Sequence, residues 1–115
     1  GIAGGAGVAG AVAYLLGARP EQIGNAINNH LGSCAAVICD GAKTGCALKV
    51  AGLIGQAVNS ALLAINGCFI KPGDGIVDKD AETTMRDIGI VSRQGLSAMD
   101  PAILGIMKAK RQIKL

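Results

Sequence analysis

The stretch CALKVAGLIGQAVNSALLAIN, residues 46–66, decides the fold that the sequence predicts. It runs for about five or six helical turns with few polar residues, and Gly67 follows as a helix-stop signal. A helix that is apolar on every side belongs in the interior of a protein. We therefore expect this Ala/Gly-rich helix to be buried and central.

Two helical patterns precede this segment. GGAGVAGAVAYLLG, residues 4–17, ends at a glycine that can close a helix. PEQIGNAINNHLGSCAAVIC, residues 20–39, begins with Pro20 at the first helical position and repeats apolar residues at helical spacing. Both segments predict helices that pack against residues 46–66.

Two further helices are predicted after the GCFIKPGDGIV loop, residues 67–77. Asp78 and Asp80 are candidate N-caps of a helix that ends near Gly95. Asp100 and the proline after it predict an N-cap and first turn for a last helix over 101–110. No segment alternates as a strand does, so we predict an all-α bundle of about five helices.

The length and the first residues indicate how the chain is organised. At 115 residues it has the size of one domain, residues 1–115. It opens with GIAGGAG, which lacks an initiator Met and has no polar face. We expect a fragment of a longer protein, in which material before residue 1 covers this face.

Composition and charge exclude several functional classes. The net charge is +3, but basic residues gather near the C-terminal end (Lys108, Lys110, Arg111 and Lys114), as cations do in the last turn of a helix. No aromatic residues are interleaved with them, so we expect no nucleic-acid partner. Residues 1–17 are at the lower length limit of a membrane span and are weakly hydrophobic because of their glycines, so we expect a buried helix there. Four cysteines without a secretory signal favour the cytoplasm.

The segment CDGAKTGC, residues 39–46, concentrates reactive side chains. Its glycines favour a loop that turns the thiols of Cys39 and Cys46 toward one centre, which favours a metal or iron–sulfur site. A turn between helices and a disulfide are the alternatives. Lys43 would supply positive charge, and Asp40 could cap the next helix or orient that lysine. Two thiolates do not complete a tetrahedral site, so further ligands must come from elsewhere.

Three other residues have no assigned role. Cys34 and Cys68 lie in apolar surroundings and are first interpreted as small hydrophobic residues. His30 lies four residues before Cys34, so a shared metal is geometrically allowed, but a partly buried histidine without a ligand role is the favoured interpretation.

Several segments of the sequence are similar to those of a known protein family. ICDGAKTGCALKVA, residues 38–51, together with AINNHLGS at 26–33 and the segment from Ser60 to Met107, resembles the serine dehydratase-like α-chain family. Within this family it more closely resembles the L-cysteine desulfidase branch and the uncharacterised relatives of that branch, and the similarity covers essentially the whole chain. The match is to the C-terminal part of that family's cluster-binding domain.

The resemblance implies an oxygen-sensitive [4Fe-4S] cluster held by three cysteines. Cys39 and Cys46 match two of these ligands, and the third would precede residue 1. The implied reaction converts L-serine or L-cysteine to pyruvate and ammonia, with sulfide released from cysteine. The N-terminal part of the enzyme, which contributes substrate-binding residues, would be a partner, and the enzyme would form a homo-oligomer. The isolated fragment would be inactive.

A different class of function stays open beside this one. The chain could be a non-catalytic helical module, either a structural zinc binder or an interaction scaffold.

Overall fold

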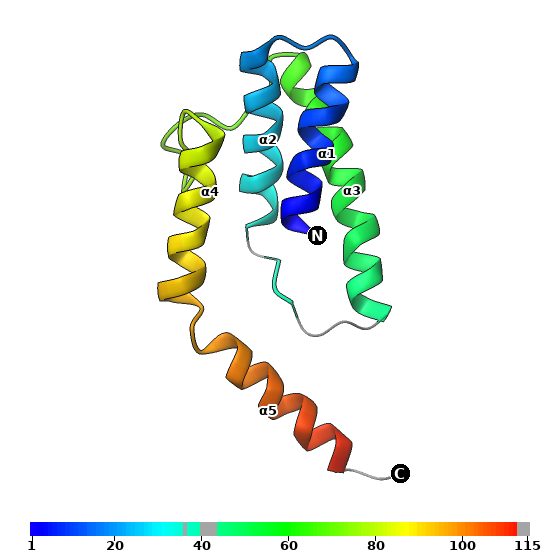
Figure 1. Ribbon diagram of the computed structural model, residues 1–115, viewed down its shortest axis with the longest axis vertical. Helices are drawn as coiled ribbons and strands as arrows, with labels where there is room; N and C mark the ends of the chain where they lie inside the picture. Colours follow the sequence, from blue (N-terminus) through cyan, green and yellow to red (C-terminus); the bar gives the residue numbers. More distant parts are fainter. Residues whose placement is uncertain (36, 40–43, 113–115) are drawn as a thin grey trace.

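The computed structural model describes residues 1–35, 37–39 and 44–112. Figure 1 shows the arrangement of its helices. In chain order they are α1 (Ile2–Leu15), α2 (Pro20–Cys34), α3 (Thr44–Ile65), α4 (Ala81–Ile90), the π-helical turn η1 (Val91–Gly95) and α5 (Met99–Gln112). The described residues contain no strand, which confirms the all-α prediction.

The first three helices pack together and form the core, and each of them contacts the other two (Figure 1). The centre of this packing consists of alanines with almost no exposed surface: Ala9, Ala13, Ala26, Ala57, Ala61 and Ala64. Small side chains allow helix backbones to approach closely, which explains how a chain with one Phe, one Tyr and no Trp can build a core.

Two glycines end helices as the sequence predicts. Gly17 follows α1 with a φ of +80°, and Gly67 follows α3 with a φ of +78°. In each case the glycine amide and the next amide donate to carbonyls of the last turn, at distances of 2.8–3.1 Å. This pattern is the Schellman motif, whose left-handed residue is best supplied by glycine.

A buried asparagine joins α2 to α3 and to the loop that follows α3. The Asn29 Nδ2 donates to the carbonyls of Ser60 (3.3 Å) and Cys68 (3.0 Å), and its Oδ1 accepts from the amide of Ile70 (2.8 Å). Polar atoms buried in this way must be paired to avoid a desolvation cost. Asn29 therefore fixes the path of the chain as it leaves α3.

The N-cap of α4 is Asp80, one of the two candidates. Its carboxylate accepts from the amide and the hydroxyl of Thr83, both at 2.8 Å. The hydrogen bond from the Thr83 amide is the main reason why the pKa of Asp80 is lowered. The helix continues through η1 and stops at Gly95, as predicted.

Two predicted helix boundaries are wrong. The second helix ends at Cys34 rather than at residue 39, and Val37 and Ile38, β-branched residues with lower helix propensity, lie outside it. The last helix begins at Met99, so Asp100 lies in its first turn and is not its N-cap. The following proline fits there because first-turn amides need no intrahelical partner.

The expectation that residues 46–66 form a central helix is also wrong. One face of α3 packs against α1 and α2, but the other is open, and Leu48 on it is 70% exposed. Instead α2 is the helix that contacts α1, α3 and α4. The sequence pattern misled because α3 is apolar on a face that no other described part of the chain covers.

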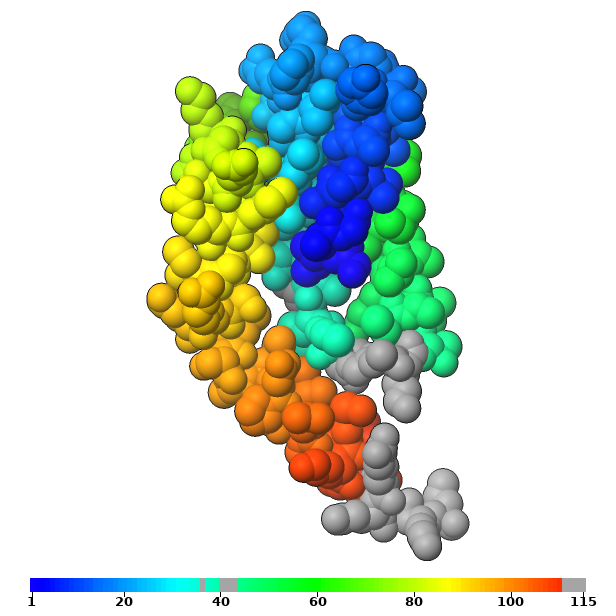
Figure 2. Space-filling view, in the orientation of Figure 1, coloured from blue at the N-terminus to red at the C-terminus, as the bar shows by residue number. Residues whose placement is uncertain are grey.

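Helix α3 is also long and apolar enough to cross a membrane, judged by length and composition. Core helices of soluble proteins share those properties, so the absence of a membrane partner stays a prediction. The molecule is elongated, with extents of 55 × 27 × 16 Å, and α5 extends beyond the helical core at the C-terminal end (Figure 2).

Candidate functional site

One end of the three-helix core contains a cavity of about 190 Å³, which we call the thiol pocket. The start of α1, the segment 37–39 after α2, and the first turns of α3 surround it. Its lining residues are Gly1, Ile2, Val37, Ile38, Cys39, Cys46, Lys49, Val50 and Leu53. The wall is mostly aliphatic, so a group held there would be partly shielded from water.

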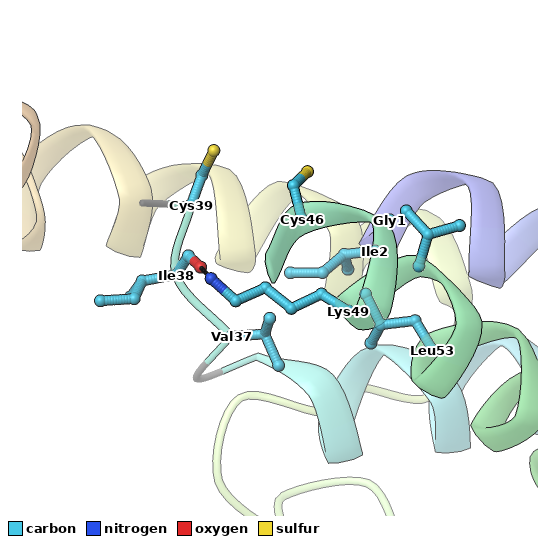
Figure 3. A pocket seen from close by; sticks show the side chains of 9 residues that line it. Gly1, Ile2, Val37, Ile38, Cys39, Cys46, Lys49 and Leu53 are labelled. Atoms are coloured by element: carbon cyan, nitrogen blue, oxygen red, sulfur yellow. Dashed lines mark hydrogen bonds between the residues drawn. The ribbon is translucent and has the colours of Figure 1, made fainter. Parts of the chain in front are cut away.

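Both predicted ligand cysteines line the thiol pocket. Cys39 is exposed and Cys46 is half-buried, and both are free thiols. Figure 3 shows the two sulfurs on the same side of the pocket, one from the 37–39 segment and one from α3. The structure therefore contains no disulfide between them, and it brings together two thiols that are not on one helix.

The α3 residues of the pocket share one helical face. Cys46, Lys49 and Leu53 follow each other at spacings of three and four residues, which places their side chains in a row. The Nζ of Lys49 donates to the carbonyl of Ile38 at 3.0 Å. Figure 3 shows this side chain running beneath the two cysteines to reach that carbonyl.

The sequence singled out a different lysine. Lys43 and Asp40, the residues considered for electrostatic support, lie outside the described residues. Lys49 was missed, although its position three residues after Cys46 on an expected helix was a usable signal.

A second apolar cavity of about 250 Å³ adjoins the first. It shares Ile2, Val37, Ile38 and Cys39 with the thiol pocket, and its far wall comes from α4, η1 and the start of α5. The Cys39 segment thus lies between two hydrophobic cavities. This places the exposed thiol of Cys39 next to surfaces from both ends of the chain.

The thiols of Cys39 and Cys46 are ligands of the kind that a soft metal centre binds, but two are too few to complete such a centre. Thiolates are the ligands of iron–sulfur clusters and of structural zinc. Within the described ranges, no group of three or more His, Cys, Asp or Glu side chains is placed to hold a metal ion. Two thiols therefore offer part of a ligand set.

His30 is fully buried between α1 and α2, not partly buried as expected. Its Nδ1 lies 3.9 Å from the sulfur of Cys34, and its Nε2 has no hydrogen-bond partner among the residues that the structure describes. The ring packs against Gly5, where an added Cβ would lie 2.2 Å from Nε2. Burial lowers the pKa of His30 more than the nearby Ile2 carbonyl raises it. These contacts indicate a neutral packing residue.

The two remaining cysteines differ from each other. Cys34 is buried, which confirms its interpretation as a small hydrophobic residue. Cys68 is exposed and contributes to a separate cleft between α2 and α3, so the same interpretation is wrong for it. Neither cysteine lines the thiol pocket.

Comparisons with known proteins place this architecture in a family. The serine dehydratase alpha chain family matches residues 1–105. The UPF0597 protein of Desulforapulum autotrophicum is 49% identical over 109 residues, which cover 95% of this chain and 25% of the relative. The UPF0597 protein of Alkaliphilus oremlandii is 45% identical with the same coverage. No solved structure matches the chain.

The chain thus spans about a quarter of the length of these curated relatives. The family match covers the thiol pocket and both of its cysteines. The chain belongs to the serine dehydratase alpha chain family.

Proposed function

We propose that this chain is the cluster-binding portion of an iron–sulfur lyase. The observation that carries the proposal is that Cys39 and Cys46, from different elements, present their sulfurs to one side of a single apolar pocket. Family membership supports it, because a serine dehydratase acts on a small amino acid. The proposed substrates are L-serine and L-cysteine, and the products are pyruvate and ammonia, with sulfide from cysteine.

In this proposal Cys39 and Cys46 supply two thiolates to a [4Fe-4S] cluster. Such a cluster, when one iron lacks a protein ligand, supplies a Lewis acid for a leaving hydroxyl or thiol. The aliphatic side chains of Ile2, Val37 and Leu53 line the pocket beside the two thiolates. The residues that bind the substrate and remove its proton are assigned to the rest of the full-length protein.

The rest of the protein is also the proposed partner of the open face of α3. Leu48 and Leu62 are exposed there, and the added Cβ of an alanine at Gly52 or Gly55 would meet nothing within 4 Å. The relatives are about four times as long as the matched segment, so they have ample chain to cover this face. Homo-oligomer formation and a cytoplasmic location complete the proposal.

The test is anaerobic reconstitution of the full-length protein with iron and sulfide. We expect visible cluster absorbance, and pyruvate from serine or cysteine. The Cys39→Ala and Cys46→Ala variants should each lose both signals, whereas Cys68→Ala, which removes a thiol outside the pocket, should keep them. A Cys39→Ala, Cys46→Ala double variant that retains cluster and activity would refute the assignment. Zinc bound by four ligands at these cysteines would favour the non-catalytic helical module instead.

A further inference from the structure

The segment that carries Cys39 makes two hydrogen bonds to other described residues. Residues 37–39 follow the end of α2 and belong to no helix. The Val37 amide donates to the carbonyl of Cys34 at 3.1 Å, which is a local turn. Among the hydrogen bonds between described residues, the one from Lys49 to Ile38 is the bond that ties this segment to α3.

Lys49 is well placed to control the geometry of the two thiols. It lies one turn after Cys46 on the same face of α3, and its ammonium bonds to the residue immediately before Cys39. The positions of Cys46 and Cys39 are thus coupled through the Lys49 side chain and the Ile38 carbonyl. Among the described residues of the thiol pocket, Lys49 carries the charged side chain.

We propose that Lys49 is a positioning residue, which holds the Ile38 carbonyl so that Cys39 and Cys46 bind one metal centre together. A flexible segment would lose conformational entropy each time both thiols bound a metal, and a segment already held in place loses less. The identity of the metal centre rests on the proposed function. The positioning itself concerns only the arrangement of the two thiols.

The test uses the full-length protein in its metal-free, reduced form, with Cd²⁺ as the probe. Cd²⁺ is a soft ion that thiolates bind, and its binding is followed by cadmium–thiolate absorbance. Lys49→Met removes the donor, Lys49→Arg keeps a charged donor, and Lys71→Met removes an exposed lysine from a distant loop. Lys49→Leu, which also lacks a donor, serves if circular dichroism shows that Lys49→Met is unfolded.

We expect Lys49→Met to weaken Cd²⁺ binding about three- to tenfold, the loss that corresponds to one hydrogen bond. Lys49→Arg should restore the affinity to within about twofold, and Lys71→Met should not change it. Cys39→Ala should weaken binding at least as much as Lys49→Met. A folded Lys49→Met or Lys49→Leu protein that binds Cd²⁺ as tightly as the wild type would overturn the proposal.

Iron reconstitution of the same proteins separates this inference from the proposed function. Lys49-dependent Cd²⁺ binding without any iron–sulfur cluster would support the positioning role and refute the lyase. If the cluster requires both cysteines but the Cd²⁺ affinity does not depend on Lys49, the lyase is supported and the positioning role is refuted.

Discussion

The contact between Gly5 and His30 yields the most sharply defined prediction. An alanine Cβ at Gly5 would lie 2.2 Å from Nε2 and 2.4 Å from Cε1 of the imidazole. Because His30 is fully buried, its ring has no solvent-facing position to move into. Gly4, the preceding residue of the same helix, is exposed, and a Cβ there would meet nothing within 4 Å. It is the matched control.

The expected magnitudes follow from two opposing effects. Replacing glycine by alanine in a helix stabilises it by up to about 1 kcal/mol, and Gly4→Ala should show this gain. Gly5→Ala gains the same amount but overpacks the α1–α2 contact, which costs about 1–3 kcal/mol. The free energy of unfolding of Gly5→Ala should therefore lie about 1–3 kcal/mol below that of Gly4→Ala.

Urea denaturation of the 115-residue chain measures this difference. Combining Gly5→Ala with His30→Ala should remove the penalty, because the ring that blocks the new methyl group is gone, and a double-mutant cycle isolates that coupling. If Gly5→Ala and Gly4→Ala agree to within about 0.5 kcal/mol, the close packing of the imidazole on Gly5 is wrong.

Three further predictions concern His30, Asn29 and Asp80. Because burial lowers the pKa of folded His30, the unfolded chain binds the proton first, so stability should be complete above about pH 6.5 and fall as the pH drops below it. Urea titrations that show no slope there, or an equal slope in His30→Asn, would contradict this. Asn29→Ala should lower the free energy of unfolding by about 2–3 kcal/mol, since it leaves buried backbone groups unpaired. Replacing the exposed Asn59 by alanine should have little effect. Equal losses in the two variants would refute the role of Asn29. Asp80→Ala should speed amide hydrogen exchange at the start of α4, because both hydrogen bonds from Thr83 are lost. The stabilisation by the carboxylate should also be lost as the pH falls below its ordinary pKa of about 3.9, because the pKa of folded Asp80 is lowered. Unchanged exchange in Asp80→Ala would contradict the cap.

Local backbone chemistry explains which parts of the fold the sequence predicts well. Gly17 and Gly67 occupy left-handed positions that favour glycine, and Pro20 begins α2 because a first-turn residue needs no amide donor. These signals depend on residues close together in the chain. They can therefore be recognised without knowledge of the tertiary structure.

The errors arise where distant parts of the molecule decide the outcome. The apolar pattern of α3 predicts burial, but it does not say whether this chain or another segment covers each face. The imidazole of His30 fits only because Gly5 on another helix lacks a side chain, a contact that the sequence does not reveal.

The candidate site also has one part that the sequence predicts and one part that it does not. The spacing of Cys39 and Cys46 within a glycine-containing segment indicates convergent thiols, and the structure places both sulfurs at one pocket. Lys49 lies one turn after Cys46 on α3, but it lies close to the Cys39 segment only because the chain after α2 approaches the first turns of α3. Its hydrogen bond is to a backbone carbonyl, which carries no signature of residue type.

The central claim is that Cys39 and Cys46 are ligands of one iron–sulfur cluster. Its most direct test is a crystal structure of the anaerobically purified full-length protein, with anomalous scattering recorded at the iron absorption edge. The account predicts a compact group of iron peaks bonded to the sulfurs of both cysteines at the thiol pocket. Iron bound elsewhere while both thiols remain free, or a single zinc ion at the pocket, would contradict it.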